Sequence, residues 1–485
     1  MYPYLLRAVF ISLLTTIGIS AQIYPPDTLY SPVFTDTPPL PAWHESIRDS
    51  SVPGEIVIFR LSRYNAEWDW YPVHDYAKIQ PWNADASLIK FASALLYDAR
   101  TGNIIRNLPG DLWESRWSHT DPDLLYSVRP DGTVKKFFLH NDSTSVILHV
   151  NGYESLRLGP GEGNFSADDQ RVSVIGKNGN DMDVLSLDMQ GGRILATRPF
   201  AGAWQNGSVP AYVDWVSVSP SGQYTLIMWN TRLTSAENPF NGHYGVEVYR
   251  TEDLAFLRRI AAYGNHGDFA FTPEGEEIFV QFYGPSGTLH AYFLDRDSLL
   301  TLHTHPDFGY GDAHVSGQNY LRPGWVYLST DPEKGGMTVA VKTDGSQTVE
   351  LFGHHFTSAA NYAKSPMPVP SPDGSRVMFR SDFGRSDNPD EVYAFIAHAE
   401  AQTAVNEISQ KQPASAYPNP FEDQLFLKAP CSVADVVIFT PEGKKIFGSR
   451  LSFPASLSTE NWKKGMFFVR LNCEKDMYIL KQWKK

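Results

Sequence analysis

One pattern recurs along most of this chain: a tight turn rich in Pro, Asp, Ser and Gly leads directly into a short apolar strand. The clearest copies are SPSG at 219–222, TPEG at 272–275 and SPDG at 371–374. Looser copies lie at 83–86, 121–123 and 166–169, and a degenerate one lies near 322–324. Proline fixes φ and glycine accepts positive φ, so the chain reverses tightly before each buried strand.

The spacing of these turns, roughly 37 to 54 residues, brackets the length of a four-stranded β-propeller blade. It predicts seven blades, at 81–116, 117–163, 164–212, 213–266, 267–312, 313–367 and 368–400. The strand Ile56–Leu61 is left over and is expected to complete the last blade, which would close the ring and remove an exposed sheet edge. A two-sheet sandwich is the competing interpretation, but it explains the even repeat less well. The predicted fold is therefore all-β, with a seven-bladed propeller over 55–400 and a small C-terminal β-sandwich.

The amino terminus has the pattern of a secretory signal peptide over residues 1–21. A single cation precedes the apolar run AVFISLLTTIGIS, and small residues follow it. The run is about thirteen residues, whereas a bilayer-spanning helix needs about twenty, so a membrane anchor is the weaker alternative. No other stretch is long or apolar enough to span, and no transmembrane segment is expected. Residues 22–54 form a Pro-rich lead-in, and 401–415 form a polar linker.

Charge and cysteine content narrow the function further. The formal net charge of -13 does not suit phosphate backbones, so nucleic acid is not an expected partner. The chain has two cysteines, Cys431 and Cys473, both near its end. Near-absence of thiols suits an oxidising compartment. The sequence leaves open whether these two remain free or form a disulfide.

The last seventy or so residues carry an ordered set of motifs: YPNPF at 417–421, QLFL at 424–427, VADVVIFTPEGKKIF at 433–447, KGMFFVR at 464–470 and a basic finish, LKQWKK. Alternating apolar residues (Val437 and Phe439; Phe467, Val469 and Leu471) predict half-buried strands, with a hairpin turn at 441–443. Residues 416–485 resemble the type A C-terminal sorting domain of the type IX secretion system of Bacteroidetes. The resemblance implies that an outer-membrane translocon recognises this domain, and that the protein is secreted or attached to the outer-membrane surface. An unrelated adhesive β-domain is the alternative.

The candidate chemistry lies in histidines at the starts of blades. Nucleophile elbows, phosphate loops and strong zinc motifs are missing from the sequence. The blades resemble the propellers of TolB-like proteins and of oligogalacturonate lyases. By that resemblance His266 corresponds to the catalytic base and His314 to a metal ligand. The His-Pro-His ligand run of the lyases is replaced by SPMP at 365–368. Ser and Met are poor ligands for a divalent ion that prefers imidazole and carboxylate. His354 and His355 are the remaining candidate metal ligands.

Each of these histidines also has a purely structural interpretation, as a hydrogen-bonding residue at a turn or strand start. His303 and His305 would share one face of a strand, but two histidines alone are a weak metal signal. The identity of any cofactor is left open. Two functions remain: a secreted propeller that binds a glycan, peptide or protein on its upper face, or a lyase or hydrolase acting on an acidic polysaccharide.

Overall fold

The computed structural model describes residues 37–485 and the strand Ile23–Tyr24. Within 37–485, the described residues do not include 53–55, 93, 113, 206, 232–238, 284–287, 305–313, 332–335, 386, 400–414, 418–420, 430, 441–443 and 474–476. The predicted signal peptide, most of the linker, His305 and the turn at 441–443 lie outside the described residues. The chain divides into two compact units, Met1–Ala401 and Gln402–Lys485. Within the described part, no helix combines the length and apolar character needed to cross a membrane.

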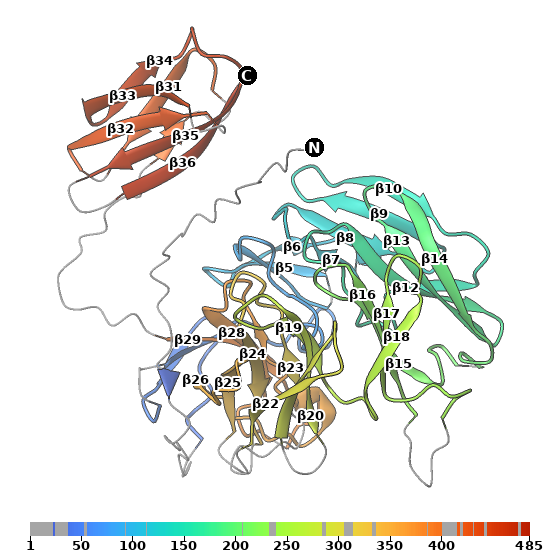
Figure 1. The fold of residues 1–485 in the computed structure, drawn as a ribbon. Coiled ribbons are helices and arrows are strands. Elements are labelled where there is room, and N and C mark those ends of the chain that lie inside the picture. The colour runs from blue at the N-terminus through green and yellow to red at the C-terminus, as the bar shows by residue number, and fades with distance from the viewer. Residues whose placement is uncertain are drawn as a thin grey trace. The chain divides into compact units, whose positions relative to one another are not determined.

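In its described residues the first unit contains seven antiparallel sheets, which follow one another in chain order around a ring (Figure 1). Blade 1 comprises β4 (Leu88–Lys90), β5 (Leu95–Asp98) and β6 (Ile104–Asn107). Blade 2 comprises β7 (Arg116–Trp117), β8 (Leu124–Val128), β9 (Thr133–Phe138) and β10 (Ser143–His149). Blade 3 comprises β11 (Ser155–Arg157), β12 (Arg171–Asn178), β13 (Asp181–Asp188) and β14 (Arg193–Phe200). Blade 4 comprises β15 (Val213–Val218), β16 (Tyr224–Trp229), β17 (Val246–Arg250) and β18 (Phe256–Ala261). Blade 5 comprises β19 (Asp268–Phe271), β20 (Glu277–Tyr283), β21 (Thr288–Phe293) and β22 (Leu299–His303). Blade 6 comprises β23 (Val315–Ser316), β24 (Trp325–Ser329), β25 (Met337–Lys342), β26 (Val349–His354) and β1 (Ile23–Tyr24). Blade 7 comprises β27 (Val369–Pro370), β28 (Arg376–Ser381), β29 (Tyr393–Ala399), β3 (Ile56–Arg60) and β2 (Ser46–Asp49). Short 3-10 helices occur at η1 (Gly110–Leu112) and η5 (Tyr362–Lys364).

Burial shows which strand of each blade faces the axis. In blade 4, β15 is buried at every position but one, whereas β18 is largely accessible. The outer strands β6, β10 and β14 are similarly exposed. In these blades the sheet packs its first strand inward and exposes its last, as expected when apolar faces bury against neighbouring blades around a ring. In blade 6, by contrast, β26 is buried along its length.

The ring closes as the sequence predicts. Strand β3 pairs antiparallel with β29, with Ile56 opposite Ala399 and Arg60 opposite Phe395. Residues from the beginning and the end of the propeller thus share one sheet. This pairing covers the edge that β29 would otherwise expose.

Two boundaries differ from the predicted ones. Part of the lead-in expected at 22–54 is strand: β2 pairs with β3, and β1 pairs with β26, so that both cover sheet edges. Strand β11 joins the sheet of blade 3, although its residues were expected in blade 2. Edge pairing satisfies backbone N–H and C=O groups without any side-chain signature, so sequence patterns do not reveal it.

The second unit is a two-sheet sandwich. One sheet has the order β30 (Ser415–Tyr417), β31 (Gln424–Lys428), β34 (Ala455–Ser458). The other has the order β33 (Lys445–Ser452), β32 (Val433–Phe439), β35 (Gly465–Asn472), β36 (Met477–Lys484). The core between them includes Phe467, Val469 and Leu471, as predicted. In β32, however, Val436 and Ile438 are buried, and Val437 and Phe439 lie on the other face. Both faces of this strand carry apolar residues, so alternation alone left the register ambiguous.

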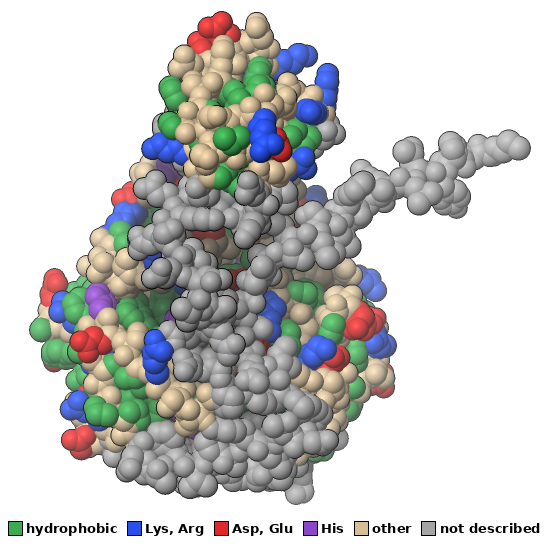
Figure 2. Space-filling model, turned by 90° about the vertical axis from the view of Figure 1, so that its left-hand side faces the viewer, with side chains coloured by type: hydrophobic (Ala, Val, Ile, Leu, Met, Phe, Trp, Pro, Cys, Tyr) green, Lys and Arg blue, Asp and Glu red, His purple; other side chains and the backbone are tan. Residues whose placement is uncertain are grey.

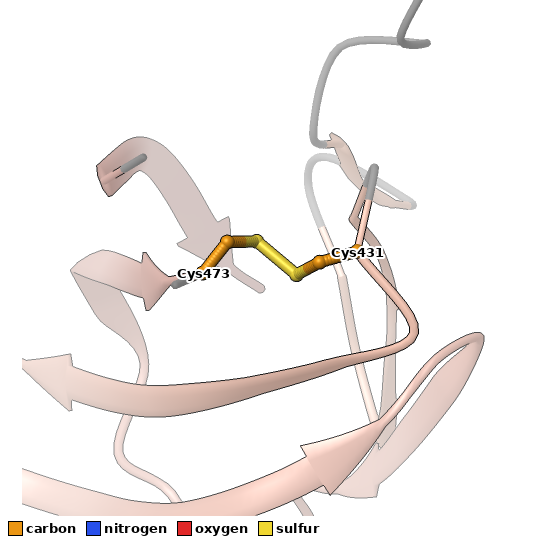
Figure 3. Close-up of a disulfide and its surroundings, with 2 residues drawn as sticks. All are labelled: Cys431 and Cys473. Carbon is orange, nitrogen blue, oxygen red and sulfur yellow. A yellow bond between two sulfur atoms is a disulfide. The ribbon is translucent and has the colours of Figure 1, made fainter. Parts of the chain in front are cut away.

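A disulfide joins Cys431 to Cys473 (Figure 3), with an S–S distance of 2.04 Å and a Cα–Cα distance of 6.0 Å. Cys431 precedes β32, and Cys473 follows β35. These neighbouring strands pair with Asp435 opposite Asn472. The bridge therefore links two chain segments that the sheet already holds side by side. The sequence left open whether the two cysteines are free or paired, and the structure shows that they are paired.

Candidate ligand-binding site at the propeller axis

An axial segment, residues 74–82, runs through the middle of the ring between β3 and the first blade. Its residues are buried except for Asp75 and Tyr76, which are partly exposed. The Gln80 amide donates to the carbonyl oxygens of Gln318 (2.7 Å) and Pro370 (3.1 Å), in blades 6 and 7. On the opposite side, the Trp117 indole of blade 2 donates to the carbonyl of Pro81 (2.9 Å). A segment in contact with blades on opposite sides of the ring must lie at the axis.

Side chains at the entrances of the inner strands converge on this segment. Because each blade repeats the same strand order, the residues just before or at the start of each inner strand lie at one end of the ring. Arg116, Asp214, His266 and His314 lie at or next to such starts. Glu162 instead follows the short strand β11, and Tyr362 lies in η5, ahead of β27. This end of the axis, defined by those residues with Tyr76 and Lys78, is referred to below as the axial mouth.

Two histidines and two tyrosines form a contiguous group in the axial mouth. The Tyr76 hydroxyl lies 2.6 Å from Nδ1 of His266, and Nε2 of His314 lies 3.2 Å from the Tyr362 hydroxyl. The two imidazole rings are 4.5 Å apart between centroids, and Tyr76 meets His314 edge-on at 5.0 Å. His266 is exposed and Tyr362 is 52% exposed, while His314 is buried. The group therefore has an accessible side formed by His266 and Tyr362 and a buried side formed by His314.

Both tyrosines stay neutral at ordinary pH. Burial, reinforced by the negative charge of Glu162, raises the pKa of Tyr76. Burial likewise raises the pKa of Tyr362, although the hydrogen bond with Tyr76 opposes the shift. Neutral phenols can both donate and accept hydrogen bonds, so this part of the axial mouth suits a polar uncharged group.

A buried ion pair lies beside the aromatic group. Nζ of Lys78 is 2.7 Å from Glu162 Oε2, and the side chains are 1% and 28% exposed. The ammonium also lies over the rings of Trp215 (4.4 Å) and Tyr76 (5.0 Å). Burial lowers the pKa of Lys78, but the charges of Glu162 and Asp214 outweigh it and the net shift is upward. Lys78 is therefore cationic.

Further buried ionisable groups fix the axial segment directly, as Arg380 does, or through Gln318, the partner of Gln80, as Asp268 does. Arg380 donates to the carbonyl oxygens of His74 (2.6 Å) and Asp75 (2.9 Å), and burial lowers its pKa to about 10. Asp268 is fully buried and accepts hydrogen bonds from the Gly317 amide and the Gln318 side chain, both at 2.9 Å. Burial raises the pKa of Asp268 to about 7, against the lowering effect of those hydrogen bonds and of Lys78. These contacts fix the backbone beneath the axial mouth.

The candidate metal ligands occupy different places in blade 6. His314 precedes β23, the innermost strand, whereas His354 ends β26, three strands further out, or about 14 Å at the usual strand spacing. Nδ1 of His354 lies 2.7 Å from Asp49 Oδ2, and Nε2 of His355 lies 3.0 Å from the carbonyl oxygen of Thr330. Burial lowers the pKa of His355 to about 4. His354 thus has a hydrogen-bond partner in β2 of blade 7, and His355 has one within blade 6, both away from the axial mouth.

A resident metal does not fit the residues that the structure describes. Among them, no group of three or more His, Cys, Asp or Glu is arranged to hold a metal ion. Within the SPMP segment, the buried Met367 accepts a hydrogen bond through its carbonyl from Nε2 of His74 (2.8 Å). This segment packs against the axial segment. His303 is buried at the end of β22.

Sequence reasoning missed the axial segment, with Tyr76 and Lys78, and it also missed Glu162 and Tyr362 on the surrounding blades. The available signal was the run WYPVHDYAKIQPWN at 70–83, which mixes apolar and charged residues and fits neither a repeat nor a linker. Figure 2 shows cationic and anionic side chains interspersed on the face that it presents.

Comparison with solved structures identifies the fold class. An oligogalacturonate lyase in complex with manganese is 13% identical, with a TM-score of 0.51, over 75% of this chain and 97% of its own. Oligogalacturonate lyase from Vibrio parahaemolyticus is 13% identical, with a TM-score of 0.48, over 74% of this chain and 96% of its own. At this identity the likeness concerns the fold alone. The first unit is thus a β-propeller, with the fold of the lyase in complex with manganese.

Comparison with protein families identifies the second unit. Residues 415–485 match the family described as the secretion system C-terminal sorting domain. Curated proteins give no significant match. The C-terminal unit is a type IX secretion system sorting domain, as its sequence motifs predict, and the protein is secreted or attached to the outer-membrane surface.

Proposed function

We propose that the protein is a cell-surface or secreted binding module whose propeller captures a polar ligand, a glycan or a protein segment, at the axial mouth. One observation carries this proposal: different blades bring His266, His314 and Tyr362 against Tyr76, and Glu162 against Lys78, of a single axial segment. Such convergence concentrates donors, acceptors and aromatic rings in one place. Convergent polar groups of this kind are typical of ligand sites.

Preorganisation supports the same conclusion. The axial segment is held by buried hydrogen bonds from several blades, so Tyr76 and Lys78 do not have to be ordered when a ligand arrives. Binding to an ordered site avoids part of the entropic cost of association. The axial segment is thus held in place by the blades, while His266 and Tyr362 remain accessible to a ligand from solvent.

The test is a binding screen of the full-length protein on glycan and cell-envelope arrays, with His266→Ala and Tyr362→Ala in parallel. We expect the parent to retain a ligand and each variant to bind it at least about tenfold more weakly, the loss of roughly one good polar contact. Phe256→Ala, an exposed aromatic on β18, is the matched control. No ligand for the parent, or equal binding by the axial variants, would overturn the proposal.

A second candidate is lyase activity on an acidic polysaccharide, favoured by the 2.6 Å contact between Tyr76 and Nδ1 of the exposed His266. In the tautomer whose Nδ1–H donates to the Tyr76 oxygen, this contact orients the imidazole and makes Nε2 the basic ring nitrogen. His266 would then remove a proton beside the uronate carboxylate. The assay is formation of unsaturated product, followed by ultraviolet absorbance, from pectate fragments with added manganese. Absence of product from any uronate polymer, or full activity of His266→Ala, contradicts this candidate.

A further inference from the structure

A cleft of about 520 Å³ lies where the chain leaves blade 7 and enters blade 1. One wall is the segment that follows β3, and the other comes from β5 and the outer strand β6. Because β6 is the outermost strand of its blade, this cleft is separate from the axial mouth. The residues that matter for the argument are Trp43, Arg63, Tyr64, Glu67, Trp68 and Asn107.

Aromatic rings form the accessible surface of this cleft. Tyr64 is 41% exposed, and Trp43 and Trp68 are partly exposed. The Tyr64 ring packs against Tyr71 at 5.1 Å, and its hydroxyl is hydrogen-bonded to Asp69. Aromatic rings kept accessible yet fixed in orientation offer flat apolar platforms to a ligand.

A tight turn holds these rings in place. Asn65 Oδ1 accepts hydrogen bonds from the amides of Glu67 (2.9 Å) and Trp68 (3.2 Å). The backbones of Asn65 and Trp70 exchange two further hydrogen bonds, at 2.9 and 3.3 Å. The loop is therefore ordered before any ligand binds, which lowers the entropic cost of binding.

The polar groups of the cleft are balanced in charge. Arg63 lies over the Trp43 ring at 3.8 Å, and Glu67 supplies one exposed carboxylate. Asn107 adds an exposed amide. One cation and one anion beside an amide favour a ligand that is uncharged but rich in hydrogen-bonding groups. A purely apolar ligand would remove these groups from water without replacing their hydrogen bonds.

We propose that this cleft binds a neutral saccharide chain. Sugar rings have apolar C–H faces that stack on aromatic platforms, and hydroxyl edges that bond to planar side chains such as those of Arg63, Glu67 and Asn107. The volume lies within the range of sites for small ligands. The cleft would attach the secreted protein to polysaccharide independently of what the axial mouth binds.

The experiment is affinity electrophoresis of the full-length protein through gels containing mixed-linkage β-glucan, xyloglucan, galactomannan or dextran, followed by calorimetry with matching oligosaccharides. We expect retardation by at least one neutral polysaccharide, and binding weakened at least tenfold in Tyr64→Ala and in Arg63→Ala. Neither substitution removes a buried side chain, and melting temperatures near the parent value would verify folding. Phe256→Ala serves as the control and should bind within twofold of the parent. His266→Ala is measured in parallel to report any binding at the axial mouth.

Three results would overturn the saccharide proposal. The first is no retardation by any of the four neutral polysaccharides. The second is unchanged binding by Tyr64→Ala. The third is stronger retardation by polygalacturonate that His266→Ala abolishes, which would place saccharide binding at the axial mouth. Because the His266 variant is measured in parallel, failure of this proposal is distinguishable from failure of the axial site.

Discussion

The buried ion pair between Lys78 and Glu162 in the axial mouth predicts that removing the carboxylate lowers the free energy of unfolding more than removing the ammonium does. At 2.7 Å and an effective dielectric constant of 20, the attraction between Lys78 and Glu162 is about 6 kcal/mol before desolvation. Glu162→Gln leaves an ammonium that is only 1% exposed without its nearest counter-ion. Removing one partner from a buried pair costs about 3–5 kcal/mol. Because Glu162 is itself 28% exposed, we expect the lower end, about 3 kcal/mol.

The converse substitution should be far milder. Lys78→Met leaves a carboxylate that can reach water, and the methionine side chain fills the space beside Trp215. We expect a loss of about 1 kcal/mol or less. Urea unfolding followed by tryptophan fluorescence measures both changes, with the exposed Glu274→Gln as the matched control. A cost for Glu162→Gln no greater than that for Lys78→Met would refute this account of the axial mouth.

Three further expectations concern the disulfide, the buried carboxyl and the sorting domain. Replacing Cys431 and Cys473 by serine opens a loop spanning 42 residues, and should lower the free energy of unfolding of the C-terminal unit by about 4 kcal/mol from loop entropy. An unchanged unfolding midpoint of that unit would contradict this. Asp268 keeps its proton up to about pH 7 in the folded state, whereas the ordinary pKa is 3.8. The folded protein therefore binds more protons between these values, and stability falls as pH rises, by up to about 1.4 kcal/mol per pH unit from this group. Asp268→Asn should remove that part of the slope in unfolding curves measured from pH 4 to 8, and an identical slope would argue against it. Deleting 415–485 should retain the protein in the periplasmic fraction, and continued appearance at the surface or in the medium would show a different export route.

The architecture was predictable because its cause is local. A Pro/Asp/Gly turn before an apolar strand has the same steric reason in every copy, so the blade count and the closing role of Ile56–Leu61 follow from the repeat. The sorting domain was recognisable for a similar reason, since its motifs stand in a fixed order over residues 415–485.

The axial mouth was only partly predictable. His266 and His314 stand at blade starts, and the structure brings them together with ring centroids 4.5 Å apart. Tyr76 belongs to a segment that occurs once, so no period marks it, and its partner His266 is 190 residues away. His354 and His355 carried the same sequence signal as the axial pair. The position of a strand within its blade, and not the residue type, separates them from the axis.

The central claim is that ligands bind at the axial mouth, and hydrogen exchange of the full-length protein tests it most directly. The measurement compares the protein alone with the protein saturated by an array-recovered ligand whose binding His266→Ala weakens. We expect slowed exchange in peptides covering 74–80, 264–268, 314–318 and 360–365, with little change on the outer strands. Protection confined to the outer blade faces or to residues 415–485 would contradict the claim.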